Sequence, residues 1–244
     1  HGIRQGHGLG PQYYTIKTPA NRLKCYNHKS HKVSNFTETL WLSQILASSC
    51  HKSRLLEKAG IITCVDLRQW IENPKQIDPF SVCNSFATVT PVSHIRPGMT
   101  LRELGRQMRL DLHRRLDNFE QFSFAKAFEN ENQDTDANDE SQDPVLEITS
   151  MGTLHLRPPI VDAYTSFTVQ PVHASRVVSL MSFGVKSRNI DDVIIRLRYG
   201  ANQFSTHEMN LYGKTIDYFM HNVDLDLTVN DAYQELLSFQ KQLE

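Results

Sequence analysis

The feature that most constrains the fold is a long amphipathic segment that begins at Thr100. Thr100 and Glu103 stand three residues apart, as in a capping box, where each side chain accepts a hydrogen bond from the other residue's backbone N–H. Apolar residues then recur every three or four positions and form one stripe: Leu101, Leu104, Met108, Leu112, Leu116, Phe119 and Phe122. A helix with a one-sided stripe has to cover an apolar surface, so other elements must form beneath it.

Three further segments carry helix signals. The first begins at Ser34 or Asn35, which can cap it, and fades by about residue 53. The second begins at Ser205 and extends to about residue 221, and the third begins at Thr228. The side chains predicted to face inward from the second are Met209, Tyr212, Ile216 and Phe219, and those from the third are Val229, Tyr233, Leu236 and Leu237.

Several segments are rich in β-branched residues and predict strands, namely 60–67, 81–95, 145–151, 165–171, 176–184 and 192–199. Pro91 marks an edge or a bulge in the second of them. In the last, apolar side chains alternate with Arg196 and Arg198, which is typical of a strand with one buried face. Because strands and helices do not alternate regularly, the sequence predicts an α/β protein of the α+β type, with a mixed, largely antiparallel sheet flanked by helices.

The domain organisation follows from two stretches without periodicity. Residues 1–20 are rich in Gly and are predicted to be a loop or tail, followed by one domain over 21–244. Residues 129–143 contain seven acidic residues and no basic one, which predicts a disordered acidic insertion or, alternatively, an interaction segment. This insertion separates residues 1–128 from 144–244.

Composition argues against several classes of protein. Hydrophobic residues make up 39% of the 244, enough for a core, yet no apolar run approaches the roughly 18 residues that a membrane span needs. No leader peptide can be read. The four cysteines lack a C-x-x-C pair, so neither a metal site nor disulfides are expected, and free thiols favour a reducing, cytoplasmic location.

Motif searches give mainly absences. The sequence has no phosphate-binding loop, dinucleotide fingerprint, nucleophile elbow or zinc-hydrolase helix, so no tightly bound cofactor is expected. Arg102, Arg106, Arg109 and His113 form a basic stripe, but Glu103 and Asp111 interrupt it and no aromatic residues are interleaved. A solvated helix face is the simpler interpretation, and a nucleic-acid partner is not expected.

The order of the features is more informative than any one of them. A capped helix leads to a strand that ends in Asp66-Leu67-Arg68, followed by FSVCNSFATV, TLRELGRQMRLDL, LEITSMGTL, VIIRLRYGANQFS and a last helix that ends in SFQKQLE. This order resembles the C-terminal half of the CoA-dependent acyltransferase superfamily, which includes chloramphenicol acetyltransferase and the condensation domains of peptide synthetases. The fungal alcohol acetyltransferases look nearest, over roughly residues 20–243.

The resemblance implies two similar halves that face each other across a channel, with acyl-CoA as co-substrate and an alcohol or amine as acceptor. The general base would be the second His of a His-His-x-x-x-Asp-Gly motif in the N-terminal half. This chain lacks that motif. Its nearest match begins at His113 and ends at Asp117, but it lies within the long helix, lacks the preceding His and has Asn118 in place of Gly. No catalytic residue is therefore assigned.

Three places match channel or framework positions of the family. Asp66 and Arg68 match its Asp-Leu-Arg element and are expected to form a structural ion pair, with a direct role in the channel as the alternative. Asn84 and Ser85 occupy a strand segment that lines the channel in the family, although the Gly found there is absent. An ordinary strand is the alternative interpretation of this segment.

The third place is Thr149-Ser150-Met151-Gly152, which resembles the family's Ser-Asn-x-Gly on a strand beside the reacting centre, with Ser150 in place of Asn. The resemblance makes Thr149, Ser150 and Gly152 candidates for the channel wall or for donors to an oxyanion. Gly152 would allow close approach of the backbone. A plain strand end is the alternative.

The sequence thus predicts an acyltransferase-superfamily protein represented by its C-terminal half. Two alternatives remain: a catalytically inactive homologue that binds or interacts, and one half of a split enzyme. The expected partners are acyl-CoA, a small acceptor and either the missing N-terminal half or a second copy of this chain.

Overall fold

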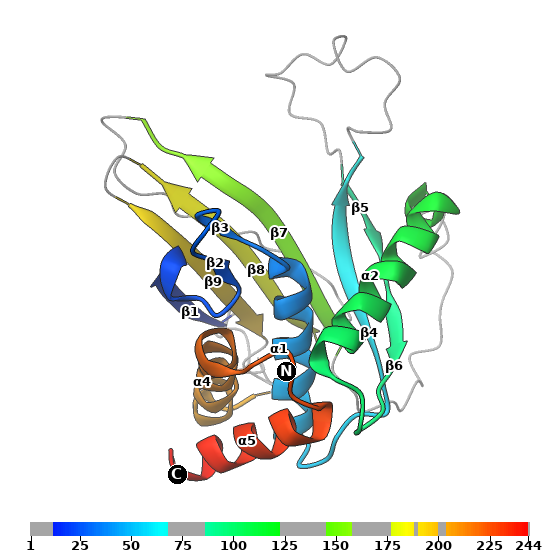
Figure 1. Cartoon of the computed structure of the whole chain (residues 1–244), viewed down its shortest axis with the longest axis vertical. Coiled ribbons are helices and arrows are strands. Elements are labelled where there is room, and N and C mark those ends of the chain that lie inside the picture. Colours follow the sequence, from blue (N-terminus) through cyan, green and yellow to red (C-terminus); the bar gives the residue numbers. More distant parts are fainter. Residues whose placement is uncertain are drawn as a thin grey trace, which may run out of the picture.

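A computed structural model describes residues 12–67, 86–122, 145–157, 177–187, 190–199 and 204–243. Its helices lie over one face of a seven-stranded mixed sheet (Figure 1). The strands are β1 (Gln12–Pro19), β4 (Lys58–Asp66), β5 (Phe86–Val89), β6 (Val92–His94), β7 (Val145–His155), β8 (Val177–Lys186) and β9 (Asp191–Tyr199), with a separate pair of β2 (Tyr26–Asn27) and β3 (Lys32–Val33). The helices are α1 (Phe36–His51), α2 (Leu101–Asp117), α4 (Thr206–Asn222) and α5 (Val229–Lys241). Both predicted element types are therefore present.

The strand order is β1-β9-β8-β7-β4-β5, with β6 paired to β4. β1, β9 and β8 pair antiparallel, as do β4 with β5 and β4 with β6. The two central pairs, β4 with β7 and β7 with β8, are parallel. Parallel neighbours require a crossover connection, and α2 lies in the connection between β6 and β7. The predicted mixed, largely antiparallel sheet is confirmed.

α1 is the central helix and contacts α2, α4, α5 and the sheet. Its largest side chain, Trp41, is fully buried. Two polar side chains that α1 buries bond to neighbouring elements: Gln44 Nε2 donates to the Val178 carbonyl at 2.9 Å, and Ser48 Oγ lies 2.8 Å from the Tyr212 hydroxyl. Because buried polar groups are costly without a partner, these bonds fix α1 against β8 and α4.

The predicted starts of the helices are confirmed, although at the start of α1 Asn35 takes the N-cap position without a side-chain capping hydrogen bond. Thr100 with Glu103 and Ser205 with Glu208 form complete capping boxes, and the Thr228 side chain accepts from the backbone N–H of Asp231. A bridge between Thr100 and Thr228 joins the starts of α2 and α5. The side chains predicted to face inward from α4 and α5 are buried, except Leu237, which is partly buried and packs against the core.

The apolar stripe on α2 ends earlier than predicted. Leu101, Leu104, Met108 and Leu112 are buried, but Phe119 and Phe122 are 60% and 47% exposed. The helix ends at Asp117, and Phe119 has a φ of 58°, a left-handed conformation that turns the chain away from the helix axis. Periodicity alone does not show this change of direction, so the last two positions of the predicted stripe are wrong.

Residues 12–19 were predicted as loop or tail and instead form β1, which pairs with β9 along its whole length. The Tyr14 ring lies against Gly213 of α4, where an added Cβ would collide with it. The Thr18 hydroxyl lies 3.0 Å from His221 Nε2, also on α4. These contacts join residues about 200 positions apart in the chain, so no local sequence pattern predicts them.

β9 also differs from its prediction. One buried face was expected, but both faces are buried, with Ile194 at 6% and Arg196 at 3% exposure. The Arg196 guanidinium lies 4.5 Å from the centre of the Tyr13 ring, a contact that helps a cation tolerate burial. The predicted strand over 165–171 and the acidic insertion over 129–143 lie outside the described residues. Of the predicted strand 81–95, the described part forms β5 and β6 on either side of Pro91.

Candidate functional site at the fork between β4 and β7

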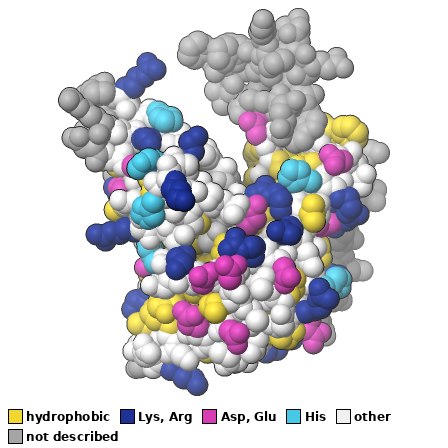
Figure 2. Space-filling view, in the orientation of Figure 1, with side chains coloured by type: hydrophobic (Ala, Val, Ile, Leu, Met, Phe, Trp, Pro, Cys, Tyr) yellow, Lys and Arg dark blue, Asp and Glu magenta, His cyan; other side chains and the backbone are white. Residues whose placement is uncertain are grey.

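The central parallel pair of the sheet separates after a short contact. β4 and β7 pair over Ile61–Thr63 and Leu146–Ile148 only, although β4 continues to Asp66 and β7 to His155. Beyond this contact the strands diverge into one arm with β4, β5 and α2 and another with β7, β8 and β9 (Figure 1). Figure 2 shows a hollow between the two arms. The point of separation, at Cys64 and Thr149, is called the fork below.

A β-bulge in β7 lies just beyond the point of divergence. The β7–β8 register shifts between Ser150 and Thr153, which pair with Ser182 and Gly184, so β7 has one extra residue there. Gly152 lies in the bulge with a φ of +74°, a conformation that glycine adopts at low cost. Bulges bend a strand and increase its twist, and this one follows the last β4–β7 pair, Thr63 with Ile148.

The Thr149 side chain bonds across the fork to β4. It is half-buried, and its hydroxyl donates a hydrogen bond to Cys64 Sγ at 3.1 Å. Burial raises the pKa of the Cys64 thiol; the bond from Thr149 acts in the opposite direction, and the nearby charge of Glu147 raises that pKa further. The thiol is therefore protonated at neutral pH and a weak nucleophile.

Ser150 has the opposite orientation. Side chains alternate along a strand, so Ser150 lies on the face of the buried Ile148, while Thr149 lies on the face of Cys64. Ser150 and Gly152 are exposed, and the Ser150 hydroxyl has no hydrogen-bond partner among the described residues. Of the candidate residues predicted on this strand, Ser150 is thus the one with a donor available to a ligand.

Of the other predicted site residues, the structure describes only Asp66. Asp66 is the last residue of β4, is exposed, and pairs with Phe86 of β5. Arg68, Asn84 and Ser85 lie outside the described residues, so the ion pair of Asp66 with Arg68 and the channel role of Asn84 and Ser85 stay predictions.

Beneath the fork, a contact network joins three elements that are distant in sequence. Trp41 Nε1 of α1 donates to Thr63 Oγ1 of β4 at 3.2 Å. The Arg109 guanidinium of α2 lies 5.3 Å from the centre of the Trp41 ring, and its Nε donates to Glu38 Oε1 at 2.7 Å. The sequence assigned Arg109 to a solvated helix face, and the structure instead ties it to α1. This network holds the arm that contains α2 in place.

The described residues contain neither a metal site nor a membrane span. No three His, Cys, Asp or Glu side chains in this part of the chain gather as a metal ion would require. None of the described helices has the length and apolar character needed to cross a bilayer. His113, whose sequence context argued against a catalytic role, is exposed on α2.

Comparison with solved structures finds the same fold in condensation and epimerization domains of synthetases. The chain is similar to the starter condensation domain of rhizomide synthetase RzmA, with a TM-score of 0.54 and 11% identity over 91% of this chain and 48% of that one. It is also similar to the epimerization domain from the third module of tyrocidine synthetase B, with a TM-score of 0.58 and 8% identity over 95% of this chain and 49% of that one. A third similar structure is the complex of the X-domain and OxyB from teicoplanin biosynthesis. Its TM-score is 0.57 and its identity 12%, over 91% of this chain and 48% of that one.

These likenesses define a condensation-domain-like fold. The chain spans about half the length of each of these solved chains. Searches of protein-family models and of curated proteins give no match. The fold predicted from the order of sequence features is therefore confirmed.

Proposed function

We propose that this chain is the C-terminal half of an acyltransferase that moves an acyl group from CoA to an alcohol or amine. The observation that carries the proposal is the likeness of 90% or more of this chain to about half of a condensation or epimerization domain. The sequence resemblance to fungal alcohol acetyltransferases supports an alcohol as acceptor. One structure of the RzmA starter condensation domain holds C8-CoA and Leu-SNAC, which supports a thioester as donor.

In this proposal the general base comes from outside the chain, from a His-His-x-x-x-Asp-Gly half. That His takes the proton from the acceptor, whose oxygen or nitrogen attacks the thioester carbonyl. The resulting oxyanion needs a donor, and we assign the Ser150 hydroxyl at the fork, which has no hydrogen-bond partner among the described residues. Collapse of the tetrahedral intermediate breaks the carbon–sulfur bond, and the CoA thiolate leaves and takes up the proton.

The bulge would contribute by opening space. Because Gly152 has no side chain and a positive φ, β7 bends away from β4 just beyond Ser150. The hollow between the arms in Figure 2 is the route that we propose for the acyl donor or the acceptor. Thr149 would act indirectly, since its hydroxyl is bonded to Cys64. The described cysteines, Cys25, Cys50 and Cys64, are free thiols, which fits the cytoplasmic location that we propose.

Two alternative functions follow from the same fold. Ser150 stands where the family has Asn, and the chain lacks the base motif, which favours a homologue that binds ligands or proteins without catalysis. A split enzyme would instead receive the base from a second polypeptide. The first predicts no transfer under any condition, and the second predicts transfer only when the partner is present.

The test is acyl transfer from acetyl-CoA, measured as thiol release with alcohol and amine acceptors. We expect no turnover from the 244 residues alone and turnover when a half that carries the His motif, encoded upstream or as a separate chain, is supplied. In the active assembly, Ser150→Ala should lower kcat about 10- to 100-fold. The matched control is Ser30→Ala, which removes another exposed hydroxyl and should leave the rate unchanged.

Two results would contradict the proposal. Turnover by the isolated chain that disappears with His113→Ala would show that the base is present after all. An active assembly in which Ser150→Ala and Ser30→Ala behave alike would remove Ser150 from the site and leave only the assignment to the fold.

A further inference from the structure

A second hydroxyl lies close to Ser150, on the other side of the bulge. Ser150 pairs with Ser182 of β8, and Thr153 pairs with Gly184. A Cβ added at Gly184 would lie 2.8 Å from Thr153 Oγ1, so the Thr153 hydroxyl lies next to the space that a side chain at 184 would occupy. Thr153 is exposed, and its hydroxyl has no hydrogen-bond partner among the described residues. Two exposed hydroxyls without described partners therefore flank the bulge.

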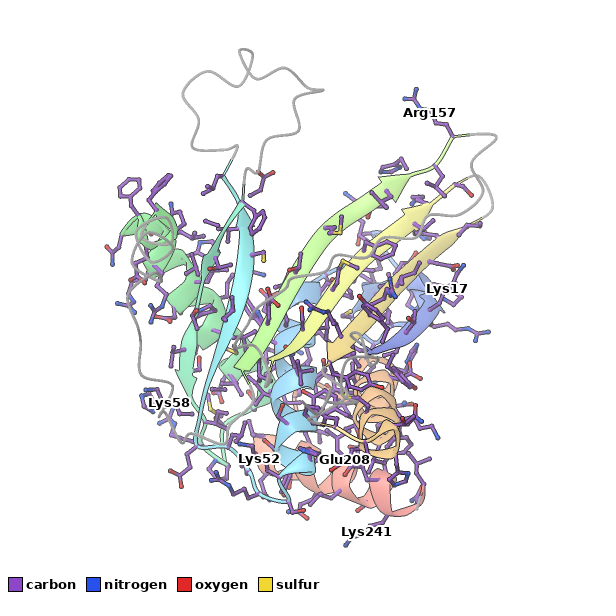
Figure 3. All side chains as sticks on the ribbon, turned by 180° about the vertical axis from the view of Figure 1, so that it is seen from behind. Lys17, Lys52, Lys58, Arg157, Glu208 and Lys241 are labelled. Atoms are coloured by element: carbon purple, nitrogen blue, oxygen red, sulfur yellow. The ribbon has the colours of Figure 1, made fainter. Side chains whose placement is uncertain are left out.

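The side-chain alternation of β8 places both hydroxyls on the helix-covered face of the sheet. Leu180 belongs to the main core beneath the helices, whereas Phe183 belongs to a separate cluster. Because side chains alternate along a strand, Ser182 and a Cβ at Gly184 point the same way as Leu180. Figure 3 shows Arg157 at the tip of the arm that contains β7. The two hydroxyls thus lie along this arm, between the fork and its tip.

The spacing of the two hydroxyls suits a single acceptor oxygen. Ser182 and Gly184 are two residues apart on β8, which separates their Cα atoms by about 6.6 Å. Ser150 and Thr153 stand opposite them, so despite the extra residue their Cα atoms lie about as far apart. An oxygen that accepts two hydrogen bonds of about 2.8 Å lies between donors up to about 5.6 Å apart. Rotation about χ1 brings the two hydroxyls within this range.

The neighbouring hydroxyl of Ser182 does not qualify as a donor to a ligand. Ser182 lies on the same face, and its hydroxyl also lacks a hydrogen-bond partner, but its side chain is fully buried. A ligand in the hollow can reach exposed groups only. Thr153 is therefore the residue that can act together with Ser150.

We propose that Thr153 is a second hydrogen-bond donor to the acyl carbonyl oxygen, together with Ser150. This inference rests on the proposed function, which supplies the acyl ligand. The two hydroxyls donate to the thioester carbonyl and then to the oxyanion of the tetrahedral intermediate, whose charge strengthens both bonds. The bulge thereby has a further role, because its extra residue places Thr153 rather than Gly152 opposite Gly184. Gly184 in turn leaves the space that the Thr153 side chain needs.

The test is the ¹³C resonance of acetyl-CoA that is labelled at its carbonyl carbon and bound to the isolated chain. Because this chain lacks the base motif, we expect the thioester to persist during the measurement. Hydrogen bonds polarise a carbonyl, so binding should move the resonance downfield, and Thr153→Val should reduce this shift by about half, since one of two donors is lost. The matched control is Thr15→Val, which alters an exposed threonine of β1 and should leave the shift unchanged.

Two further variants test the arrangement rather than the presence of the hydroxyl. Gly184→Ala adds a methyl group that displaces the Thr153 side chain, and should reduce the carbonyl shift as Thr153→Val does. In the active assembly, Thr153→Val should lower kcat about 10- to 100-fold with little change in KM, and Thr153→Ser should retain most of the activity.

The outcomes separate this inference from the proposed function. A carbonyl shift that Thr153→Val reduces, in a chain that no partner activates, would keep Thr153 as a donor and remove acyl transfer. Acyl transfer that responds alike to Thr153→Val and Thr15→Val, with an unchanged carbonyl shift, overturns the role of Thr153 alone. Absence of both a carbonyl shift and turnover overturns both proposals.

Discussion

The helix-covered end of the molecule and the forked end share one sheet, yet they differ in how deeply their side chains are buried. At the helix-covered end, α1 is buried among α2, α4 and α5, and the Tyr212 hydroxyl donates to the Gln44 carbonyl at 3.2 Å while it contacts Ser48. At the fork, Ser150 has a hydroxyl without a described partner, and Met151 is exposed. The difference teaches that one end supplies the stability and the other keeps groups available for ligands or partners.

The largest expected effect comes from the buried end. Trp41→Ala removes a fully buried ring and should lower the free energy of unfolding by about 3–5 kcal/mol, since it leaves a cavity and frees Thr63 and Arg109 from their contacts. Chemical denaturation measures this. Leu110→Ala, at an exposed position, is the control. A loss for Trp41→Ala as small as that of the control would show that this end is not the stable one.

A smaller effect should follow from separating α2 from β6. Asp111 Oδ2 accepts from the Val92 backbone N–H at 2.8 Å, and the same carboxylate pairs with Arg115 and Arg114. Burial acts to raise the pKa of Asp111, but these partners outweigh it and lower the pKa to about 2. Asp111→Asn should cost about 1–2 kcal/mol.

The pH dependence gives the sign of this effect. Because the folded pKa of Asp111 lies below its ordinary 3.8, its contribution is present above pH 3.8 and is lost as the pH falls through about 2. The difference in unfolding free energy between the natural chain and Asp111→Asn should therefore shrink as the pH is lowered through this window. A difference that stays constant down to about pH 2 would contradict the assignment.

His221 should show a weaker dependence of the opposite sign. Its Nδ1 lies 3.2 Å from Asp217 Oδ1, and the bond to Asp217 raises its pKa against the opposing effects of burial and of Arg22. The contribution is then fully present below pH 6.5 and is lost as the pH rises through the folded pKa. Unfolding free energies of the natural chain and His221→Gln should converge as the pH rises. An equal gap at about pH 5 and about pH 8 would contradict this.

The smallest effect is expected at the fork. Ser150→Ala should change the free energy of unfolding by less than about 0.5 kcal/mol, because it removes an exposed hydroxyl without a described partner. Thr149→Ala should cost more, since it removes the bond to Cys64. Thermal or chemical denaturation of the two variants checks the order. If Ser150→Ala proves the more destabilising, its hydroxyl belongs to the framework rather than to a site.

Features that depend on neighbouring residues could be predicted from the sequence, whereas features that depend on residues far apart in the chain could not. Thr100 and Glu103 determine a helix start between themselves, so their capping box could be read directly. Thr149 was identified by resemblance, but its hydrogen-bond partner across the fork, Cys64, was not, because 85 residues separate the two in the chain. The register of a parallel pair depends on groups far apart in the chain, and no local pattern contains it.

By itself, the sequence determined where the helices begin, where β4, β7, β8 and β9 lie, and which fold the order of elements resembles. Those properties arise from neighbouring residues, through capping, side-chain period and turn chemistry. The tertiary structure decided the place of β1 beside β9, the turn at Phe119 and the separation of β4 from β7. Each of these depends on which distant surfaces meet, and packing free energy, rather than local propensity, selects among them.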